Sequence, residues 1–180
     1  VERADDFPAA VHALAIDPSH NRTLYAGLSY TGGVYKSTDG GGTWSSSGLD
    51  GVAISALALD PRNPGVLYAA GGSRVFNSAD GGASWSPINQ GLDSLLQSSF
   101  IVTAIVVDAS SSQTVYLATS GAGVFRTIDG GANWTSFNTG LGSLGVRVLV
   151  SAAGRLYAGT SRGVFTIDPE MPEKLPTASP

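Results

Sequence analysis

Four short stretches of the chain carry apolar side chains at nearly every position. We expect each to form the first strand of a repeated unit, over residues 11–17, 54–60, 102–108 and 146–151. A strand with one face in solvent alternates apolar and polar residues, whereas residues 13–16 (Ala-Leu-Ala-Ile) do not alternate. The pattern therefore predicts strands covered on both faces, as in a sheet packed between two other sheets.

Two further strands follow each first strand in the same order. The second contains a tyrosine between apolar residues, and after a short Gly or Ser loop the third begins with valine and an aromatic residue. The tyrosines are Tyr25, Tyr68, Tyr116 and Tyr157, and the aromatic residues are Tyr35, Phe76, Phe125 and Phe165. With a fourth strand expected after each third, units of this length are typical of an all-β fold, the β-propeller, whose antiparallel sheets pack face to face around an axis.

A motif of the form Ser/Thr-x-Asp-Gly-Gly-x-x-Trp follows three of the four third strands. Its aspartates lie 41 and then 49 residues apart, and all three tryptophans of the chain occupy its last position. The motif residues are Ser37, Asp39, Gly41 and Trp44, then Ser78, Asp80, Gly82 and Trp85, then Thr127, Asp129, Gly131 and Trp134. We expect a hairpin in which Gly-Gly supplies unusual backbone angles, the carboxylate accepts backbone N–H groups, and the tryptophan packs against a neighbouring sheet.

Repetition argues that these aspartates are structural. A catalytic group is needed once in a site, whereas a turn is needed once in every blade. We therefore assign no catalytic role to Asp39, Asp80 or Asp129, and we name no catalytic residue elsewhere in the chain.

The fourth unit departs from this pattern. Asp168 is followed by Pro169-Glu170-Met171-Pro172, without Gly-Gly or tryptophan, so the unit lacks an outer strand. One hypothesis is that the N-terminal segment, residues 1–10, supplies that strand and closes the ring. We expect residues 11–168 to form the four-repeat propeller and residues 169–180 to be a Pro-rich tail or linker.

Composition and charge narrow the possible partners. The chain has 24 glycines and only 13% charged residues, which suits short strands joined by tight turns. The net charge is −4 and the ten Lys and Arg are scattered singly, so we expect no nucleic-acid partner. No apolar run reaches the roughly 18 residues of a membrane span, and the absence of cysteine excludes disulfides and thiolate metal sites.

The repeated motif and the Leu-Tyr-Ala strands resemble the bacterial neuraminidase, or Asp-box, repeat of sialidases, sortilin-type receptors, xyloglucanases and photosystem II assembly factors. The resemblance covers residues 11 to 168 and implies propeller blades. Because that family contains both enzymes and binding scaffolds, it does not imply one activity. The sialidase Arg-Ile-Pro motif is absent, and all three glutamates, Glu2, Glu170 and Glu173, lie in the terminal segments.

A glycoside hydrolase would need two facing carboxylates. Asp17, Asp60 and Asp108 follow first strands at equivalent positions, so we interpret them as turn residues. Asp50 and Asp93 remain in loops as the alternative catalytic pair.

Binding residues are expected on the face opposite the Asp-boxes, where loops differ between repeats. The candidates are Tyr30, Arg74, Phe100, Arg147 and Arg162. Arg147 shares its repeat position with His12, Ser55 and Thr103, which predicts a polar ring at the channel mouth. Leu95 and Leu96, in the longest connection, are expected to pack over the channel. His12 and His20 share no metal-ligand spacing, so we expect no metal and no cofactor.

The main hypothesis is a non-enzymatic, exported binding propeller, extracellular or periplasmic, that recognises a protein or glycan partner. The alternatives are a glycoside hydrolase of sialidase or xyloglucanase type, or its inactive remnant, and a self-assembling structural protein. Four repeats also suggest half of a larger ring. Three arrangements are open: two copies that form eight blades, a strained ring of four blades, and a chain that is one piece of a larger assembly. We favour self-association as a homo-oligomer.

Overall fold

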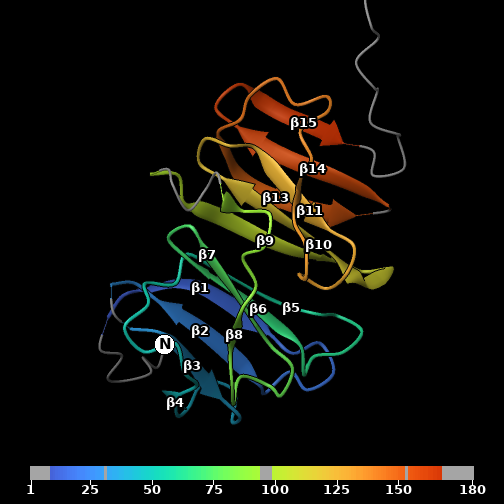
Figure 1. The fold of residues 1–180 in the computed structure, drawn as a ribbon. Coiled ribbons are helices and arrows are strands. Elements are labelled where there is room, and N and C mark those ends of the chain that lie inside the picture. Colours follow the sequence, from blue (N-terminus) through green and yellow to red (C-terminus); the bar gives the residue numbers. More distant parts are fainter. Residues whose placement is uncertain (1–8, 31, 94–98, 153, 168–180) are drawn as a thin grey trace, which may run out of the picture.

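The computed structural model describes residues 9–30, 32–93, 99–152 and 154–167, and these residues form four antiparallel sheets (Figure 1). Blade 1 contains β1 (Val11–Ile16), β2 (Leu24–Leu28), β3 (Val34–Ser37) and β4 (Ser45–Ser46). Blade 2 contains β5 (Ala56–Leu59), β6 (Leu67–Gly71), β7 (Arg74–Ser78) and β8 (Ser86–Pro87). Blade 3 contains β9 (Val102–Asp108), β10 (Ser111–Thr119), β11 (Val124–Thr127) and β12 (Thr135–Ser136). Blade 4 contains β13 (Val146–Ala152), β14 (Arg155–Thr160) and β15 (Gly163–Ile167).

Each sheet is a simple meander in which consecutive strands pair. The repeated tyrosine sets a common register: Tyr25 lies opposite Ala15, Tyr68 opposite Ala58, and Tyr116 opposite Val106. Because opposite residues in an antiparallel pair point to the same face, the register fixes which side chains share a face of the blade. The all-β propeller architecture predicted from the repeats is confirmed.

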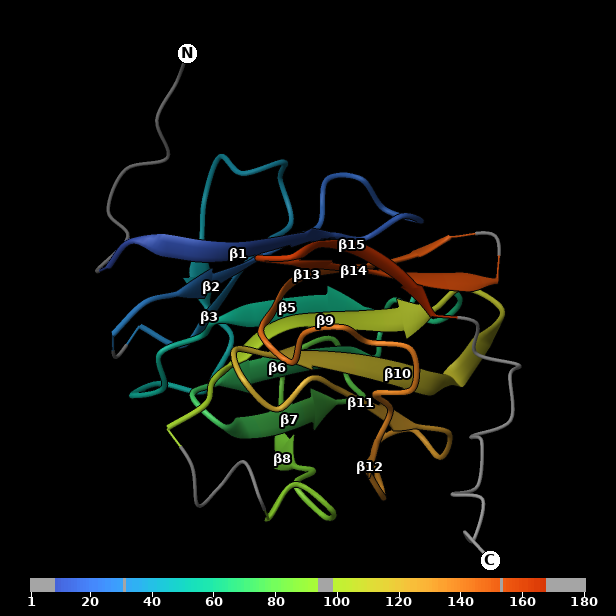
Figure 2. The same cartoon turned by 90° about the horizontal axis from the view of Figure 1, so that it is seen from above.

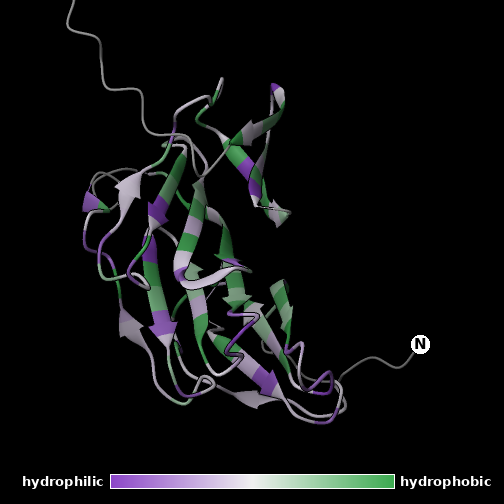
Figure 3. Ribbon diagram, turned by 90° about the vertical axis from the view of Figure 1, so that its right-hand side faces the viewer, coloured by the Kyte–Doolittle hydropathy of each residue, from purple (hydrophilic) through white to green (hydrophobic). Residues whose placement is uncertain are grey.

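The first strands β1, β5, β9 and β13 are successive neighbours, while β8 and β12 lie at the edge of the molecule (Figure 2). Each blade therefore packs a face on the next blade. Figure 3 shows that apolar positions continue along the strands, whereas hydrophilic positions are frequent in the connecting loops.

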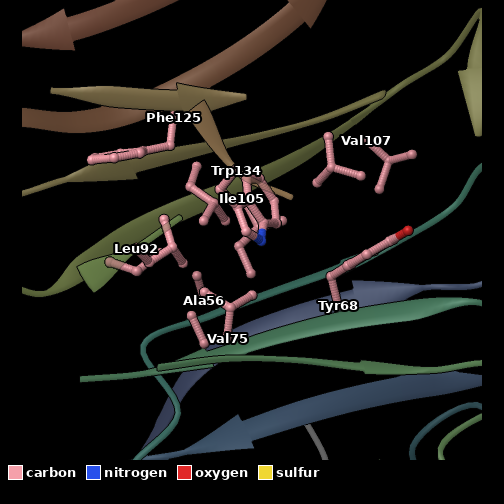
Figure 4. Close-up of a cluster of buried hydrophobic side chains, with 12 residues drawn as sticks. Ala56, Tyr68, Val75, Leu92, Ile105, Val107, Phe125 and Trp134 are labelled. Carbon is pink, nitrogen blue, oxygen red and sulfur yellow. The ribbon is translucent and has the colours of Figure 1, made fainter. Parts of the chain in front are cut away.

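The largest core lies between blades 2 and 3 (Figure 4). Tyr68 and Ala56 of blade 2 meet Ile105 and Phe125 of blade 3, and the ring of Trp134 fills the space beside them. Two smaller cores join blades 1 and 2 and blades 3 and 4 in the same way. Burial of apolar area between blades is therefore the main source of stability.

Blade 4 has three strands in the described residues, as its incomplete motif predicts. Residues 1–8 of the N-terminal segment, the Pro-rich tail, Asp168 and the pair Leu95 and Leu96 lie outside the described residues. One expectation needs correction: β1 and β13 are not covered on both faces. Leu14 and Ile16 of β1 and Val148 and Val150 of β13 are exposed, because no blade among the described residues lies against those sides.

Candidate functional site

The three Asp-boxes form the same hydrogen-bonded hairpin. In the second box, Asp80 accepts hydrogen bonds from the backbone N–H of Ser84 (2.9 Å), from its hydroxyl (2.6 Å), and from the Ser78 hydroxyl (2.8 Å). The Ser78 hydroxyl in turn accepts the N–H of Gly82 at 2.9 Å. Gly81 and Gly82 have φ angles of 69° and 86°, which glycine adopts without strain.

These bonds stabilise the charged form of each carboxyl. The Ser84 hydroxyl, followed by the Ser84 N–H, lowers the pKa of Asp80 to about 2. Hydrogen bonds from Thr127 and Asn133 lower the pKa of Asp129 to about 2. In the first box the N–H and hydroxyl of Thr43 hold the pKa of Asp39 below its ordinary value. An acid that is this strongly held in its charged form is a poor proton donor near neutral pH.

The tryptophans of the second and third motifs donate hydrogen bonds to the preceding blade. The indole N–H of Trp85 donates to the carbonyl of Ser47 at 2.7 Å, and that of Trp134 donates to Ile88 at 2.8 Å. Trp44 of the first blade instead donates to Gly41 of its own box at 3.1 Å.

The strand tyrosines of blades 1 and 2 bind the box of the next blade. The hydroxyl of Tyr25 donates to the carbonyl of Gly81 at 3.0 Å, and that of Tyr68 donates to Gly130 at 3.3 Å. Lys36 also donates to the Gly81 carbonyl, at 3.0 Å. The Asp-box side of the molecule is therefore occupied by contacts that join blades.

A pocket of about 410 Å³ lies on the opposite side, where the loops between second and third strands meet the connections between blades. It is lined by Ala10, His12, Ser29, Tyr30, Ala53, Ile54, Ser55, Gly72 and Ile101. We call it the loop-side cleft. Most of these side chains are apolar, and no acidic side chain is among them.

Tyr30 forms the exposed rim of the cleft. Its side chain is 80% exposed, and its φ of 57° is a left-handed angle that costs a tyrosine about 1–3 kcal/mol. The neighbouring Ser29 is buried, and its hydroxyl has no hydrogen-bond partner among the described residues. Strained backbone angles and unpaired buried polar groups are both more frequent at functional sites than elsewhere.

The predicted polar ring divides between two pockets. His12 and Ser55 line the loop-side cleft, whereas Thr103 and Arg147 line a second pocket of about 320 Å³ with Ser120, Gly145 and Ser161. The hydroxyls of Ser55 and Thr103 donate to the carbonyls of Val102 and Val146, each at 2.7 Å, so both side chains bind the next blade.

The other candidates lie apart from the loop-side cleft. The Phe100 ring packs closely on Gly121 beside Ile101, and Phe100 itself is exposed. Arg162 donates to the carbonyl of Gly142 at 3.5 Å, and Arg74 is exposed at the start of β7. The structure thus brings Tyr30 to the cleft, places Phe100 beside it, and leaves the three arginines elsewhere.

The acidic residues outside the boxes have turn or loop contacts. Asp17, Asp60 and Asp108 each accept the N–H of the residue two positions later, as expected for turn residues. Asp50 accepts the hydroxyl of Ser46 at 2.9 Å, and neither Asp50 nor Asp93 lines the pockets described above.

Two acids do share a pocket on the Asp-box side. Asp60 and Asp129 line a space of about 270 Å³ between blades 2 and 3. Both oxygens of Asp129 already accept side-chain hydrogen bonds, from Thr127 at 2.6 Å and from Asn133 at 2.9 Å. Burial and the charge of Asp60 raise the pKa of the nearby Tyr68. The pair therefore lacks the free second carboxylate that glycoside hydrolysis needs.

No group of three or more His, Cys, Asp or Glu side chains gathers as a metal site in the part of the chain that the structure describes. Within that part, no helix is long and apolar enough to cross a membrane.

The cleft residues that sequence reasoning missed are mainly apolar ones. Ile54, Ala53 and Ile101 belong to connections between blades, and Ser29 is one of many serines in loops. The repeat pattern gives only their positions in the sequence. Whether they meet in one pocket depends on how neighbouring blades pack. The sequence signal was the position of Ile101 directly after Phe100, which is one of the predicted binding residues.

Comparisons with known proteins agree with this architecture. No protein-family model matches the sequence. A xyloglucanase of Hypocrea jecorina (strain QM6a) is 31% identical over 98 residues, which are 44% of this chain and 12% of that enzyme. A GH74 enzyme of Niastella koreensis superposes with a TM-score of 0.67 and 21% identity, over 88% of this chain and 28% of the enzyme. A structure of YCF48 bound to D1 peptide has a TM-score of 0.65 and 21% identity, over 91% of this chain and 53% of that chain.

The chain thus spans between about an eighth and about half of these relatives. The likeness to these structures is that of the propeller fold. By its fold, the chain is a set of four β-propeller blades, three of which carry the repeated motif.

Proposed function

We propose that the chain is a non-enzymatic binding module that holds an apolar segment of a protein partner in the loop-side cleft. The observation that carries the proposal is the cleft itself, an acid-free pocket with an exposed aromatic rim and an unpaired serine hydroxyl. Apolar pockets with a few polar groups are the usual form of a binding site. Ile101, which is 46% exposed, would contact apolar side chains of the partner, and the exposed Tyr30 ring would lie against them.

Two comparisons support a binding function, but they do not point to one ligand. YCF48 has been captured with a peptide, and the GH74 enzymes are named for glycan chemistry. A glycan partner remains the second candidate because the exposed ring of Tyr30 offers a flat apolar surface on which a sugar can stack. Some neighbours are extracellular domains, which supports the proposal that this chain works outside the cytoplasm.

The test is a peptide array and a glycan array probed with the 180-residue chain, followed by titration calorimetry on the best ligand. Tyr30→Ala should weaken peptide binding at least tenfold, because it removes the aromatic rim. Ile128→Ala is the matched control, since Ile128 is exposed in the third Asp-box and lies outside the cleft. Equal binding by the Tyr30→Ala and native chains would contradict the proposal. Binding confined to glycans would favour the second candidate.

The glycoside hydrolase alternative has its own test. It draws on the 31% identity with the xyloglucanase segment, and Asp50 and Asp93 would be its acids. Assays on xyloglucan, sialyl and chromogenic glycosides should show no turnover. Turnover that is lost in Asp50→Asn or Asp93→Asn would establish the enzyme and overturn the binding proposal.

A further inference from the structure

In each blade, one residue of the third strand lies opposite the tyrosine of the second strand. Opposite residues of an antiparallel pair point to the same face, so this residue lies beside the tyrosine side chain. It is Lys36 in blade 1, Asn77 in blade 2, Arg126 in blade 3 and Thr166 in blade 4. Blades 1 and 3 thus have a cationic side chain where blade 2 has a neutral amide.

Between blades 1 and 2, the ammonium group of Lys36 is part of the boundary. It donates to the carbonyl of Gly81 at 3.0 Å, and the same carbonyl accepts the hydroxyl of Tyr25, also at 3.0 Å. The ammonium lies 5.2 Å from the centre of the Tyr25 ring. A carbonyl oxygen has two lone pairs, so it can bind both groups. A positive charge therefore lies against the box of the next blade at this boundary.

The corresponding place between blades 2 and 3 is a polar pocket of about 270 Å³. Its lining includes the counterparts of that contact, Tyr68, Asn77 and Gly130, and the Tyr68 hydroxyl donates to the Gly130 carbonyl at 3.3 Å. Among the described residues, no Lys, Arg or His lines this pocket. Arg62 directs its guanidinium to the carbonyl of Ser110 instead. The other charged and amide residues of the lining are Asp60, Asn63, Gln113 and Asp129.

Asp60 has a buried oxygen without a partner. The residue is 1% exposed, and its Oδ1 accepts the N–H of Arg62 at 2.9 Å. Its Oδ2 has no hydrogen-bond partner among the described residues. In blade 1 the equivalent Oδ2 of Asp17 lies 3.3 Å from Nδ1 of His20, and Asn63 holds the position of His20 in blade 2. A buried carboxylate oxygen is costly without a partner, and a cation would remove that cost.

We propose that a calcium ion binds in this pocket, with Oδ2 of Asp60, the amide oxygen of Asn77 and the carbonyl of Gly130 as its protein ligands. Ca²⁺ takes about six to eight oxygen ligands in flexible geometries, and carboxylate, amide, carbonyl and water oxygens all serve. The exposed carboxylate of Asp129 adds a second negative charge beside the ion. The ion takes the place that the Lys36 ammonium takes at the preceding boundary.

The spacing of residues in the sequence gives no signal for such a site. The pocket has two acidic side chains, and its other oxygens come from amides, a hydroxyl and the backbone. The expectation of no metal came from the spacing of the two histidines, and neither histidine lines this pocket. The pocket shares no lining residue with the loop-side cleft, so the inference does not depend on the proposed binding function.

Titration of calcium chloride into the EDTA-treated 180-residue chain, followed by calorimetry, tests the site. The native chain should bind one calcium ion, and calcium should raise its melting temperature. Asp60→Asn should weaken binding about tenfold or more, because it removes the buried charge from the ligand set. Asp17→Asn is the matched control, since Asp17 is the equivalent turn residue of blade 1 and does not line the pocket. This control should bind calcium as the native chain does.

Asn77→Lys gives blade 2 the cation that blade 1 has. Without calcium, this variant should melt at a higher temperature than the native chain, because the ammonium pairs with Asp60. Calcium should neither bind to it nor raise its melting temperature. Magnesium at the same concentration should stabilise the native chain less than calcium, because Mg²⁺ demands octahedral geometry and keeps its waters. Tyr30→Ala should bind calcium normally, so this inference and the proposed function fail separately.

Four results would overturn the inference. They are no heat of binding when the native chain is titrated to millimolar calcium, equal stabilisation by magnesium, native affinity in Asp60→Asn, and native affinity in Asn77→Lys. Circular dichroism of both variants shows whether they are folded, and the titration of the native chain decides the question where a variant does not fold.

Discussion

The Asp-box carboxylates accept several hydrogen bonds each. A charged carboxylate accepts these bonds more strongly than a protonated one. The pKa of Asp80 lies at about 2 against an ordinary value of 3.8, and the Ser84 hydroxyl is the largest cause. A lowered pKa means that the folded state binds the proton less readily than the unfolded state. The stability that Asp80 contributes is therefore complete above about pH 4 and is lost as the pH falls through about 2.

The lowered pKa of Asp80 predicts how variants of the second Asp-box unfold in acid. Asp80→Asn should lower the melting temperature near neutral pH, and it should flatten the decline in melting temperature between about pH 4 and about pH 2. Ser84→Ala should have an intermediate effect, because the backbone N–H of Ser84 still binds the carboxylate. Calorimetric scans from pH 6 to pH 2 provide the measurement. A decline in Asp80→Asn as steep as in the native chain would contradict the structural role.

Residues with repeated roles were the predictable ones. The Ser, Asp, Gly and Trp positions of the boxes and the turn aspartates follow from spacing alone, because each repeats in several blades. Ser29 and Ile101 of the cleft could not be identified in this way, since their importance comes from loops that meet after folding. Tyr30 was named as a candidate because it breaks the repeat, although its left-handed backbone angle was not foreseeable.

Among the strands and hairpins, the tryptophan of each box works at the boundary between blades. Trp134 is 3% exposed and donates to Ile88 of blade 2, whereas Trp44 donates within its own hairpin at the open end. The same residue type at the same motif position thus has two different environments.

We therefore expect Trp134→Ala to lower the free energy of unfolding by about 3–5 kcal/mol, the usual cost of deleting a buried aromatic side chain. Trp44→Ala should cost clearly less in the isolated chain, because no preceding blade packs on that ring. Urea unfolding followed by circular dichroism measures both. Equal costs would show that the tryptophan stabilises its own hairpin rather than the boundary between blades.

The sequence also predicted where the strands form better than whether each face of a strand is covered. The continuous apolar run of residues 13–16 correctly predicted a strand, but the expected coverage of both its faces was wrong. The structure shows that one of those faces is uncovered in β1, because coverage depends on the neighbour and not on the strand itself.

For the whole molecule, the architecture followed from the repeats, whereas the position of the cleft did not. Four similar sequence units imply four similar sheets, and the loops that emerge on each side follow from the meander. The pocket arises where the connections of three successive blades meet, and that convergence is a property of the assembled array.

The hydrogen bonds that join neighbouring blades determine where the molecule unfolds locally first. Tyrosine and tryptophan hydrogen bonds tie blade 2 to both of its neighbours, and they tie blades 1 and 3 to blade 2 only. Among the described residues, none of these bonds reaches blade 4. Amide hydrogen exchange should therefore be slowest in β6 and fastest in β13, so that the array opens first at blade 4. Uniform protection across the four blades would contradict this gradient.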